Sequence, residues 1–178
     1  MNNSYEFRSV THFTAGTQGE PGNRVFFLQL GDETGHISVR LEKQQVRALA
    51  QFLKGVLDDL PAPAASSDQG PVPLIEPALA EWVVGQIAIG VAESDAEVVL
   101  VVDELVPDSD LDDEDLSPEA EELFDAPSDR ARIRAHIDVD QAVRFVAAAN
   151  KLMSKGRPPC RLCGQPVDPD GHACPRLN

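Results

Sequence analysis

The sequence is poor in aromatic residues, in cysteine and in positive charge. Aromatic residues make up 5% of the 178 residues, so we expect a core built mainly of valine, leucine, isoleucine and alanine. Thirty acidic residues against 15 lysines and arginines give a formal net charge of −15. A chain with this charge repels DNA and anionic membranes, and we expect neither as a partner.

Long apolar runs are missing as well. No stretch of about 18 apolar residues occurs, so we expect no membrane span. Met1–Asn3 leads directly into polar residues, and we expect no signal peptide. All three cysteines lie between Cys160 and Cys174. An odd number of cysteines in one short segment indicates metal binding in a reducing compartment, which predicts a cytoplasmic protein without a disulfide framework.

The negative charge is concentrated in one segment. Residues 108–129 include eleven Asp and Glu and no Lys or Arg, whereas residues 130–157 include seven Lys and Arg and only two Asp. The prolines within 107–129 favour a mobile acidic loop over a regular element. An alternative is that this segment covers the basic surface that follows it and controls access to that surface.

Periodicity predicts six strands and two helices. Apolar residues with strand-like patterns occur at 5–14, 24–30, 36–41, 81–92, 97–106 and 131–137. Apolar residues recur every three to four positions in 43–60 and again in 138–155, which predicts two amphipathic helices. Pro61 ends the first helix, and Asp138 or Asp140 can cap the second.

Clustered strands with few helices favour an α+β fold, with about six strands in one antiparallel sheet and both helices on one face. We expect one domain over 1–156, with the acidic loop at 107–129, and a zinc-knuckle tail over 157–178. The strand-to-helix junctions at 37–42 and 133–138 resemble each other at an offset of 96 residues, so a duplicated β-β-α unit is one interpretation. The simpler alternative is that any two such junctions look alike.

The tail carries the clearest chemical motif. Cys160 and Cys163 have a spacing that lets both thiolates face one ion, and the turn-forming residues at 166–171 can bring His172 and Cys174 back to it. Three thiolates and one imidazole make up a tetrahedral set that zinc prefers. We therefore predict a structural zinc site formed by these four residues. Because all four positions would be filled, zinc catalysis is not expected.

Residues 14–24 form a glycine-rich segment between two predicted strands. Backbone N–H groups, the hydroxyls of Thr14 and Thr17, and the Arg24 guanidinium could bind an anion there. The segment does not match the Walker pattern, and no helix follows it. The competing interpretation is a long connection between strands that needs glycine at positive φ.

No known catalytic constellation occurs in the sequence, neither a nucleophile motif nor a pair of carboxylates at a useful spacing. The leading prediction is a non-catalytic binding or regulatory protein with a protein partner. One alternative is an enzyme that acts on a phosphorylated or anionic small molecule through the 14–24 segment. A second alternative is RNA contact through the basic C-terminal surface that includes Arg157, Arg161 and Arg176.

Four segments together resemble an uncharacterised actinobacterial family of unknown function: TAGTQGEPGNR at 14–24, Phe27–Gln29, LEKQQV at 41–46 and RPPCRLCGQPVDPDGHACPR at 157–176. The resemblance covers nearly the whole chain. It implies that the zinc tail belongs to the fold rather than to a fused module. It also implies that a phosphoinositide-kinase-like protein and a histidine-phosphatase-like protein are encoded nearby as candidate partners. It supplies no catalytic residues.

Overall fold

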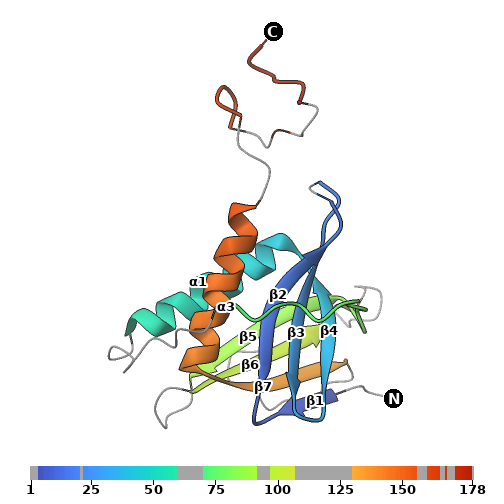
Figure 1. Ribbon diagram of the computed structural model, residues 1–178, viewed down its shortest axis with the longest axis vertical. Helices are drawn as coiled ribbons and strands as arrows, with labels where there is room; N and C mark the ends of the chain where they lie inside the picture. The colour runs from blue at the N-terminus through green and yellow to red at the C-terminus, as the bar shows by residue number, and fades with distance from the viewer. Residues whose placement is uncertain are drawn as a thin grey trace, which may run out of the picture.

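The computed structural model describes residues 4–20, 22–59, 70–91, 97–106, 130–155, 160–164, 167 and 171–177. The predicted acidic loop at 107–129 and residues 60–69, which follow the first helix, lie outside the described residues. Figure 1 shows the elements that the described residues form, in chain order: β1 (Ser4–Phe7), β2 (His12–Gln18), β3 (Val25–Asp32), β4 (Gly35–Leu41), α1 (Lys43–Asp59), β5 (Val84–Val91), β6 (Glu97–Glu104), β7 (Arg132–Asp138) and α3 (Val139–Ser154).

The strands form two sheets rather than one. One sheet has the order β1-β7-β6-β5 and the other the order β2-β3-β4. Neighbouring strands are antiparallel except β1 and β7, which run parallel with Tyr5 beside Ile133. The prediction of a single antiparallel sheet of about six strands is therefore wrong, whereas the α+β class and the two helices are confirmed.

The segment 5–14 accounts for much of this difference. Its apolar pattern predicts one strand, but the chain bends between Arg8 and Thr11, so that β1 joins the edge of β7 while β2 pairs with β3. Val10 in the bend is buried, and its carbonyl accepts a hydrogen bond from the Gln141 side chain. Apolar alternation shows which face of a strand is buried but not which strand lies beside it.

Both helices form where the periodicity predicts them. The buried positions repeat every three to four residues: Val46, Leu49, Ala50 and Leu53 in α1, and Ala142, Phe145, Ala148 and Ala149 in α3. Of the two predicted caps for α3, Asp138 is the one that forms. Its side chain accepts from the Gln141 N–H at 2.7 Å, and the Gln141 side chain accepts from the Asp138 N–H at 3.0 Å. A cap of this kind stabilises a helix by about 1 kcal/mol.

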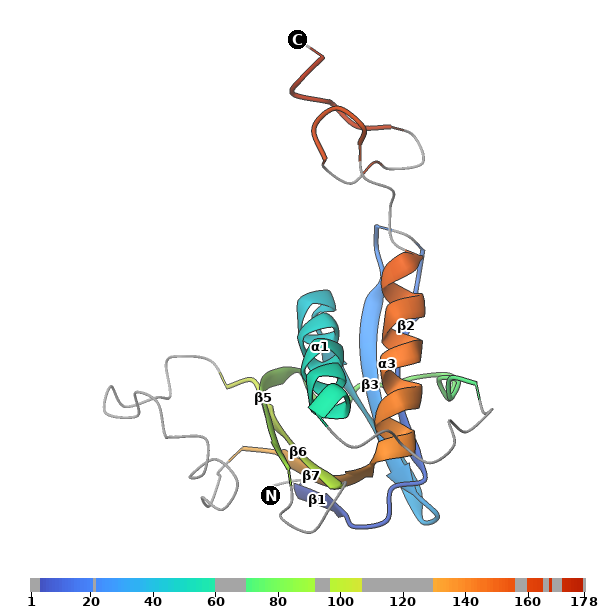
Figure 2. The same cartoon turned by 90° about the vertical axis from the view of Figure 1, so that its left-hand side faces the viewer.

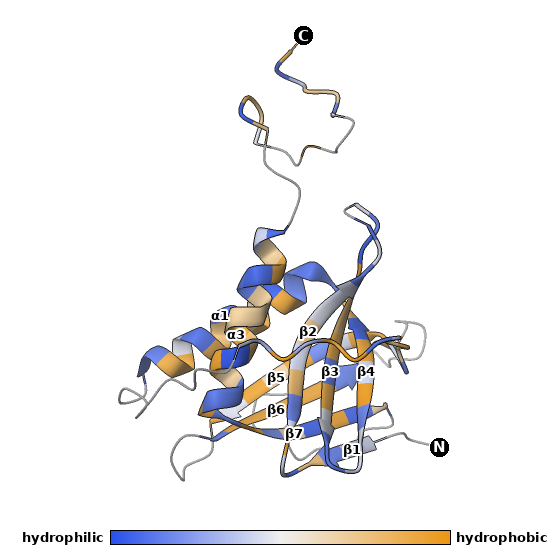
Figure 3. Cartoon of the chain, in the orientation of Figure 1, coloured by the Kyte–Doolittle hydropathy of each residue, from blue (hydrophilic) through white to orange (hydrophobic). Residues whose placement is uncertain are grey.

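One apolar core joins the two sheets and the two helices. The helices lie side by side, and α3 also packs on β2 (Figure 2), where Phe145 stacks on Phe13 with ring centroids 4.4 Å apart. Apolar residues occur along the strands of both sheets (Figure 3), and most of the buried ones belong to this core. Truncating a fully buried member, as in Leu53→Ala, would cost about 2–5 kcal/mol.

Candidate metal centre

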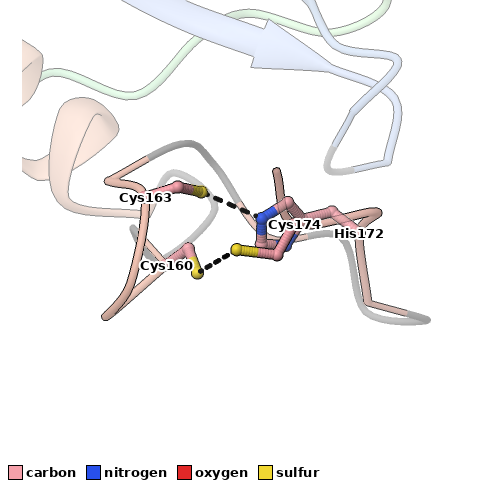
Figure 4. Close-up of side chains that lie close together, drawn as sticks. All are labelled: Cys160, Cys163, His172 and Cys174. Atoms are coloured by element: carbon pink, nitrogen blue, oxygen red, sulfur yellow. Dashed lines mark hydrogen bonds between the residues drawn. The ribbon is translucent and has the colours of Figure 1, made fainter. Parts of the chain in front are cut away.

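The C-terminal tail extends past the end of α3, away from the two sheets (Figure 1). Its first described segment, 160–164, forms a tight turn in which the Gly164 N–H donates to the Cys160 carbonyl at 2.9 Å. Gly164 has a φ of 74°, a left-handed conformation that favours glycine. The turn leaves the side chains of Cys160 and Cys163 pointing the same way (Figure 4).

The second described segment, 171–177, supplies the other two donors. Gly171 also has a positive φ, of 91°, and it directly precedes His172. The Leu177 N–H donates to the Cys174 carbonyl at 3.0 Å, which closes a turn after the last cysteine. In Figure 4 the side chains of this segment face those of the first segment across one small space.

The four donor atoms lie close enough together to reach one metal ion. All four lie within 4.8 Å of one another. The Sγ atoms of Cys160 and Cys174 are 3.9 Å apart, and Cys163 Sγ lies 3.2 Å from His172 Nε2. In a tetrahedral zinc site the corresponding sulfur–sulfur and sulfur–nitrogen separations are roughly 3.8 and 3.6 Å. The four predicted ligands are therefore together and could bind a metal ion.

The local electrostatics favour a thiolate at Cys160. The backbone N–H groups of Cys163 and Leu162 point at its sulfur and lower the pKa of this thiol, and the Leu162 nitrogen lies 3.4 Å from Sγ. Thiolate is the form that binds metal. Three sulfurs and one nitrogen also exclude the all-oxygen coordination that Mg²⁺ and Ca²⁺ require.

The three residues of the predicted anion site have separate environments. Thr14 is fully buried in β2, and its hydroxyl donates to the Val72 carbonyl at 2.6 Å. Thr17 is half-buried near the end of the same strand. Arg24 donates to the Lys155 carbonyl at 3.0 Å, just after the end of α3, where a cation is favourable. Anion binding by these residues stays a prediction, and two of the three polar groups already have partners in the protein.

Much of the glycine-rich segment is strand rather than loop. β2 continues to Gln18, and only 19–24 connect it to β3. A Cβ at Gly16 would come within 2.9 Å of the Leu74 side chain. This glycine therefore permits the close approach of residues 70–78, which cross the β2-β3-β4 sheet (Figure 1). The glycines of the connection do adopt positive φ, as the competing interpretation requires.

The fold also creates a polar cavity that the sequence gives no sign of. It measures about 600 Å³ and is lined by residues of the β1–β2 bend, the β3–β4 turn and β7, among them Arg8, Asp32 and His136. Glu97 Oε2 lies 3.1 Å from Nδ1 of His136 and orients the ring. These residues are far apart in the chain and share no spacing pattern, so only the tertiary structure brings them together.

None of the helices formed by the described residues has both the length and the apolar composition needed to cross a membrane.

Comparison with known proteins identifies one family, described as a protein of unknown function, DUF3090, whose model matches residues 5–174. The match includes both sheets, both helices and the four candidate ligands. Comparisons with curated proteins and with solved structures found no match. Because the family model covers nearly the whole chain, the protein belongs to the DUF3090 family of proteins of unknown function.

Proposed function

We propose that this chain is a non-catalytic binding or regulatory protein of the cytoplasm, and that one structural zinc ion organises its C-terminal tail. The observation that carries the proposal is the convergence of Cys160, Cys163, His172 and Cys174 within 4.8 Å. Three thiolates and one imidazole complete the four-coordinate shell of a structural zinc site. A filled shell has no position for a substrate or an attacking water. The zinc ion would therefore stabilise the conformation of the tail and take no part in catalysis.

The burial pattern of the tail supports an ordering role for the ion. Among the described residues after Lys155, only Cys174 is buried. A segment this short does not bury an apolar core of its own, and metal binding is the usual substitute. The zinc ion would therefore hold the two arms of the tail together, and the tail would lose its shape without it.

The surface of the tail supports a protein partner. Leu162 and Leu177 are exposed, and each has an exposed arginine as its neighbour, Arg161 and Arg176 respectively. Exposed apolar groups beside arginines are typical of protein interaction surfaces. Residues 157–178 contain no Phe, Tyr or Trp, whereas proteins that read single-stranded RNA rely on aromatic stacking. The kinase-like or phosphatase-like protein expected to be encoded nearby is the first partner to test.

Metal content tests the first half of the proposal. We expect the purified wild-type chain to contain about one equivalent of zinc by elemental analysis. Cys163→Ser and His172→Ala should each lower the zinc content well below that of the wild type. Leu162→Ala, which leaves all four donors in place, is the matched control. Substantially less than one equivalent in the wild-type chain would contradict the zinc site.

Partner capture tests the second half. We expect the full-length chain to retain the kinase-like or phosphatase-like protein from native cytoplasm, and to lose it after chelation or in Cys163→Ser. Leu79→Ala, an exposed site in the two-sheet body, should capture the partner normally. Capture that is the same with and without chelator would remove the tail from the binding surface.

The enzyme alternative has less support because Thr14 and Arg24 already bond to backbone carbonyls. It can still be tested directly. Turnover of phosphorylated small molecules by the purified chain, abolished in Arg24→Ala, would favour this alternative and overturn the non-catalytic assignment.

A further inference from the structure

The candidate metal centre lies at the surface of the molecule. Of its four donor residues only Cys174 is buried, whereas Cys160, Cys163 and His172 are partly exposed. The tail that carries them extends away from both sheets (Figure 1), and residues 157–178 contain no Phe, Tyr or Trp to cover the sulfurs. Small molecules in the solvent therefore have access to thiolates at this centre.

The four donors form two close pairs (Figure 4). The Sγ atoms of Cys160 and Cys174 are 3.9 Å apart, so these two sulfurs are nearly in contact. The sulfur of Cys163 instead lies 3.2 Å from Nε2 of His172. The structure thus places a second sulfur directly beside Cys160 and an imidazole directly beside Cys163. Because all four donors lie within 4.8 Å, Cys163 is the competing partner for Cys160.

A bound zinc ion would keep these cysteines in the form that peroxides oxidise. Metal binding requires the deprotonated thiolate, and the thiolate rather than the thiol is the nucleophile. An accessible thiolate is oxidised to a sulfenic acid, which condenses with a neighbouring thiol to form a disulfide. Transient disulfides of this kind are the ones that occur in reducing compartments. The pair at 3.9 Å meets both requirements, since Cys160 is accessible and Cys174 lies next to it.

We propose that Cys160 and Cys174 form a modification site for peroxides, at which oxidation joins them in a disulfide and releases the zinc ion. This inference rests on the structural zinc ion proposed above. The Cys160 thiolate attacks one oxygen of hydrogen peroxide, the O–O bond breaks, and hydroxide leaves. The Cys174 thiolate then attacks the sulfenic sulfur, the S–O bond breaks, and a second hydroxide leaves. The two sulfurs lose two electrons in total, and these reduce the peroxide.

The disulfide would change the shape of the tail. Only Cys163 and His172 would remain as donors, and two donors do not complete the four-coordinate shell of zinc. The ends of the tail would stay joined through the Cys160–Cys174 bond, whereas the part between them would lose its anchor. Leu162 lies in that part and belongs to the surface proposed for the protein partner. Peroxide would therefore weaken partner binding, and reduction with zinc present would restore it.

Zinc release and disulfide mapping in the full-length chain test the proposal. The reduced, zinc-loaded chain is treated with hydrogen peroxide, and a chromogenic chelator measures the zinc released. Each chain that releases zinc should lose two of its three thiols. Trypsin cleaves after Arg161 and an Asp-specific protease cleaves before Asp168, so each cysteine lies on a peptide of its own. Mass spectrometry should find the Cys160 peptide linked to the Cys174 peptide, with Cys163 free to be alkylated.

Two ligand exchanges form a matched pair of variants. Cys163→His and Cys174→His each leave two cysteines and two histidines, a set that also binds zinc. Cys163→His keeps both sulfurs of the proposed disulfide and should form it at nearly the wild-type rate. Cys174→His lacks the second sulfur and should form an intramolecular disulfide at least about tenfold more slowly. Dithiothreitol with added zinc should restore the metal content of Cys163→His and of the wild type.

The outcomes separate this proposal from the one on which it rests. A reduced wild-type chain without zinc would contradict the zinc site before any peroxide is added. A chain that contains zinc and keeps both the ion and its three thiols in peroxide would leave the zinc site standing and overturn the modification site. A disulfide between Cys160 and Cys163, or equal rates in the two exchange variants, would also overturn it. If neither variant binds zinc, the peptide map of the wild-type chain decides between the two pairings.

Discussion

The segments β2-β3-β4-α1 and β5-β6-β7-α3 have the same order of elements. They differ in what holds the second and third strands together at the connection between them. Each is a three-stranded antiparallel meander followed at once by a helix. At an offset of 96 residues, the buried residues Ile37, Val39 and Leu41 correspond to Ile133, Ala135 and Ile137. At the same offset, Val46, Leu49 and Leu53 correspond to Ala142, Phe145 and Ala149.

Equivalent glutamine side chains also connect each half to the other by hydrogen bonds. Gln45 and Gln141 each accept from the backbone N–H three residues earlier, at 2.8 and 3.0 Å. The amide of Gln45 donates to the Val84 carbonyl at the start of β5, and that of Gln141 donates to the Val10 carbonyl just before β2. The two segments therefore share the element order β-β-β-α, and the duplication of a β-β-α unit stays a prediction.

The halves differ at one corner. Arg132 and Asp103 form a two-bond ion pair, at 2.6 and 3.0 Å, with side chains exposed to only 15% and 7%. The pair of residues at the same place in the strand pairing of the first half is His36 and Gly31, which face each other next to the β3–β4 turn. A Cβ at Gly31 would lie 2.6 Å from the Gly35 carbonyl oxygen, so no side chain fits there.

The difference follows from the length of chain between the paired strands. A two-residue turn holds β3 and β4 together, so their ends need no further lock. Residues 105–131 separate β6 from β7, and closing so long a connection costs more entropy. The ion pair compensates by fixing the two strand ends where the long connection leaves the sheet.

Removing the ion pair should have the largest effect of the changes that test this comparison. Asp103→Ala leaves a largely buried guanidinium without its carboxylate, and we expect the free energy of unfolding to fall by about 3 kcal/mol. Urea denaturation measures this change. Asp103→Asn, which keeps the shape and one acceptor, should lose less. A loss below about 1 kcal/mol for the alanine variant would show that the corner is not a lock.

The two capping glutamines offer a matched pair of substitutions. Gln141→Ala should lower the free energy of unfolding by about 2 kcal/mol, because it removes part of a capping box and leaves the buried Val10 carbonyl without its donor. Gln45→Ala should cost about 1 kcal/mol, since Gln45 is only half-buried and its bonds to the second half are 3.3 and 3.4 Å long. Thermal and urea unfolding of the pair measure the ranking. Equal losses would mean that the two junctions are equivalent in strength.

The smallest expected change in stability concerns His12. This residue pairs with Gly31 in the first half, as Gln86 pairs with Asp103 in the second. Burial lowers the pKa of His12 below its ordinary value of 6.5, although the hydrogen bond to Gln29 acts in the opposite direction. As the pH falls through 6.5, the unfolded chain takes up this proton first, so the folded state loses stability. His12→Gln should flatten that part of the curve of unfolding free energy against pH. An unchanged slope would show that His12 does not contribute.

Local sequence patterns predicted those features of the structure that depend only on residues close together in the sequence. The helices were predictable because Val46, Leu49 and Leu53 repeat at the helical period, and periodicity is independent of the rest of the fold. The convergence of the four candidate metal ligands was predictable because the ligand spacings and turn residues lie within one short segment. The position before the apolar stripe limited the cap to Asp138 or Asp140, and the structure shows that it is Asp138.

Features that depend on distant residues were not predictable in the same way. The parallel pairing of Tyr5 with Ile133 joins the two ends of the body, and nothing in either strand specifies the other. Gly16 resembles a loop residue in the sequence, but in the structure it makes room for Leu74.

The Arg132–Asp103 corner has a practical consequence for protein engineering. Because the ends of β6 and β7 are held opposite each other, the number of residues between them can change at a modest free-energy cost, about 0.6 kcal/mol for each doubling of length. A fluorescent reporter or an affinity tag inserted between 105 and 131 would therefore leave both halves intact. The same position gives experimental access to the protein in cells while the four candidate metal ligands of the tail remain untouched.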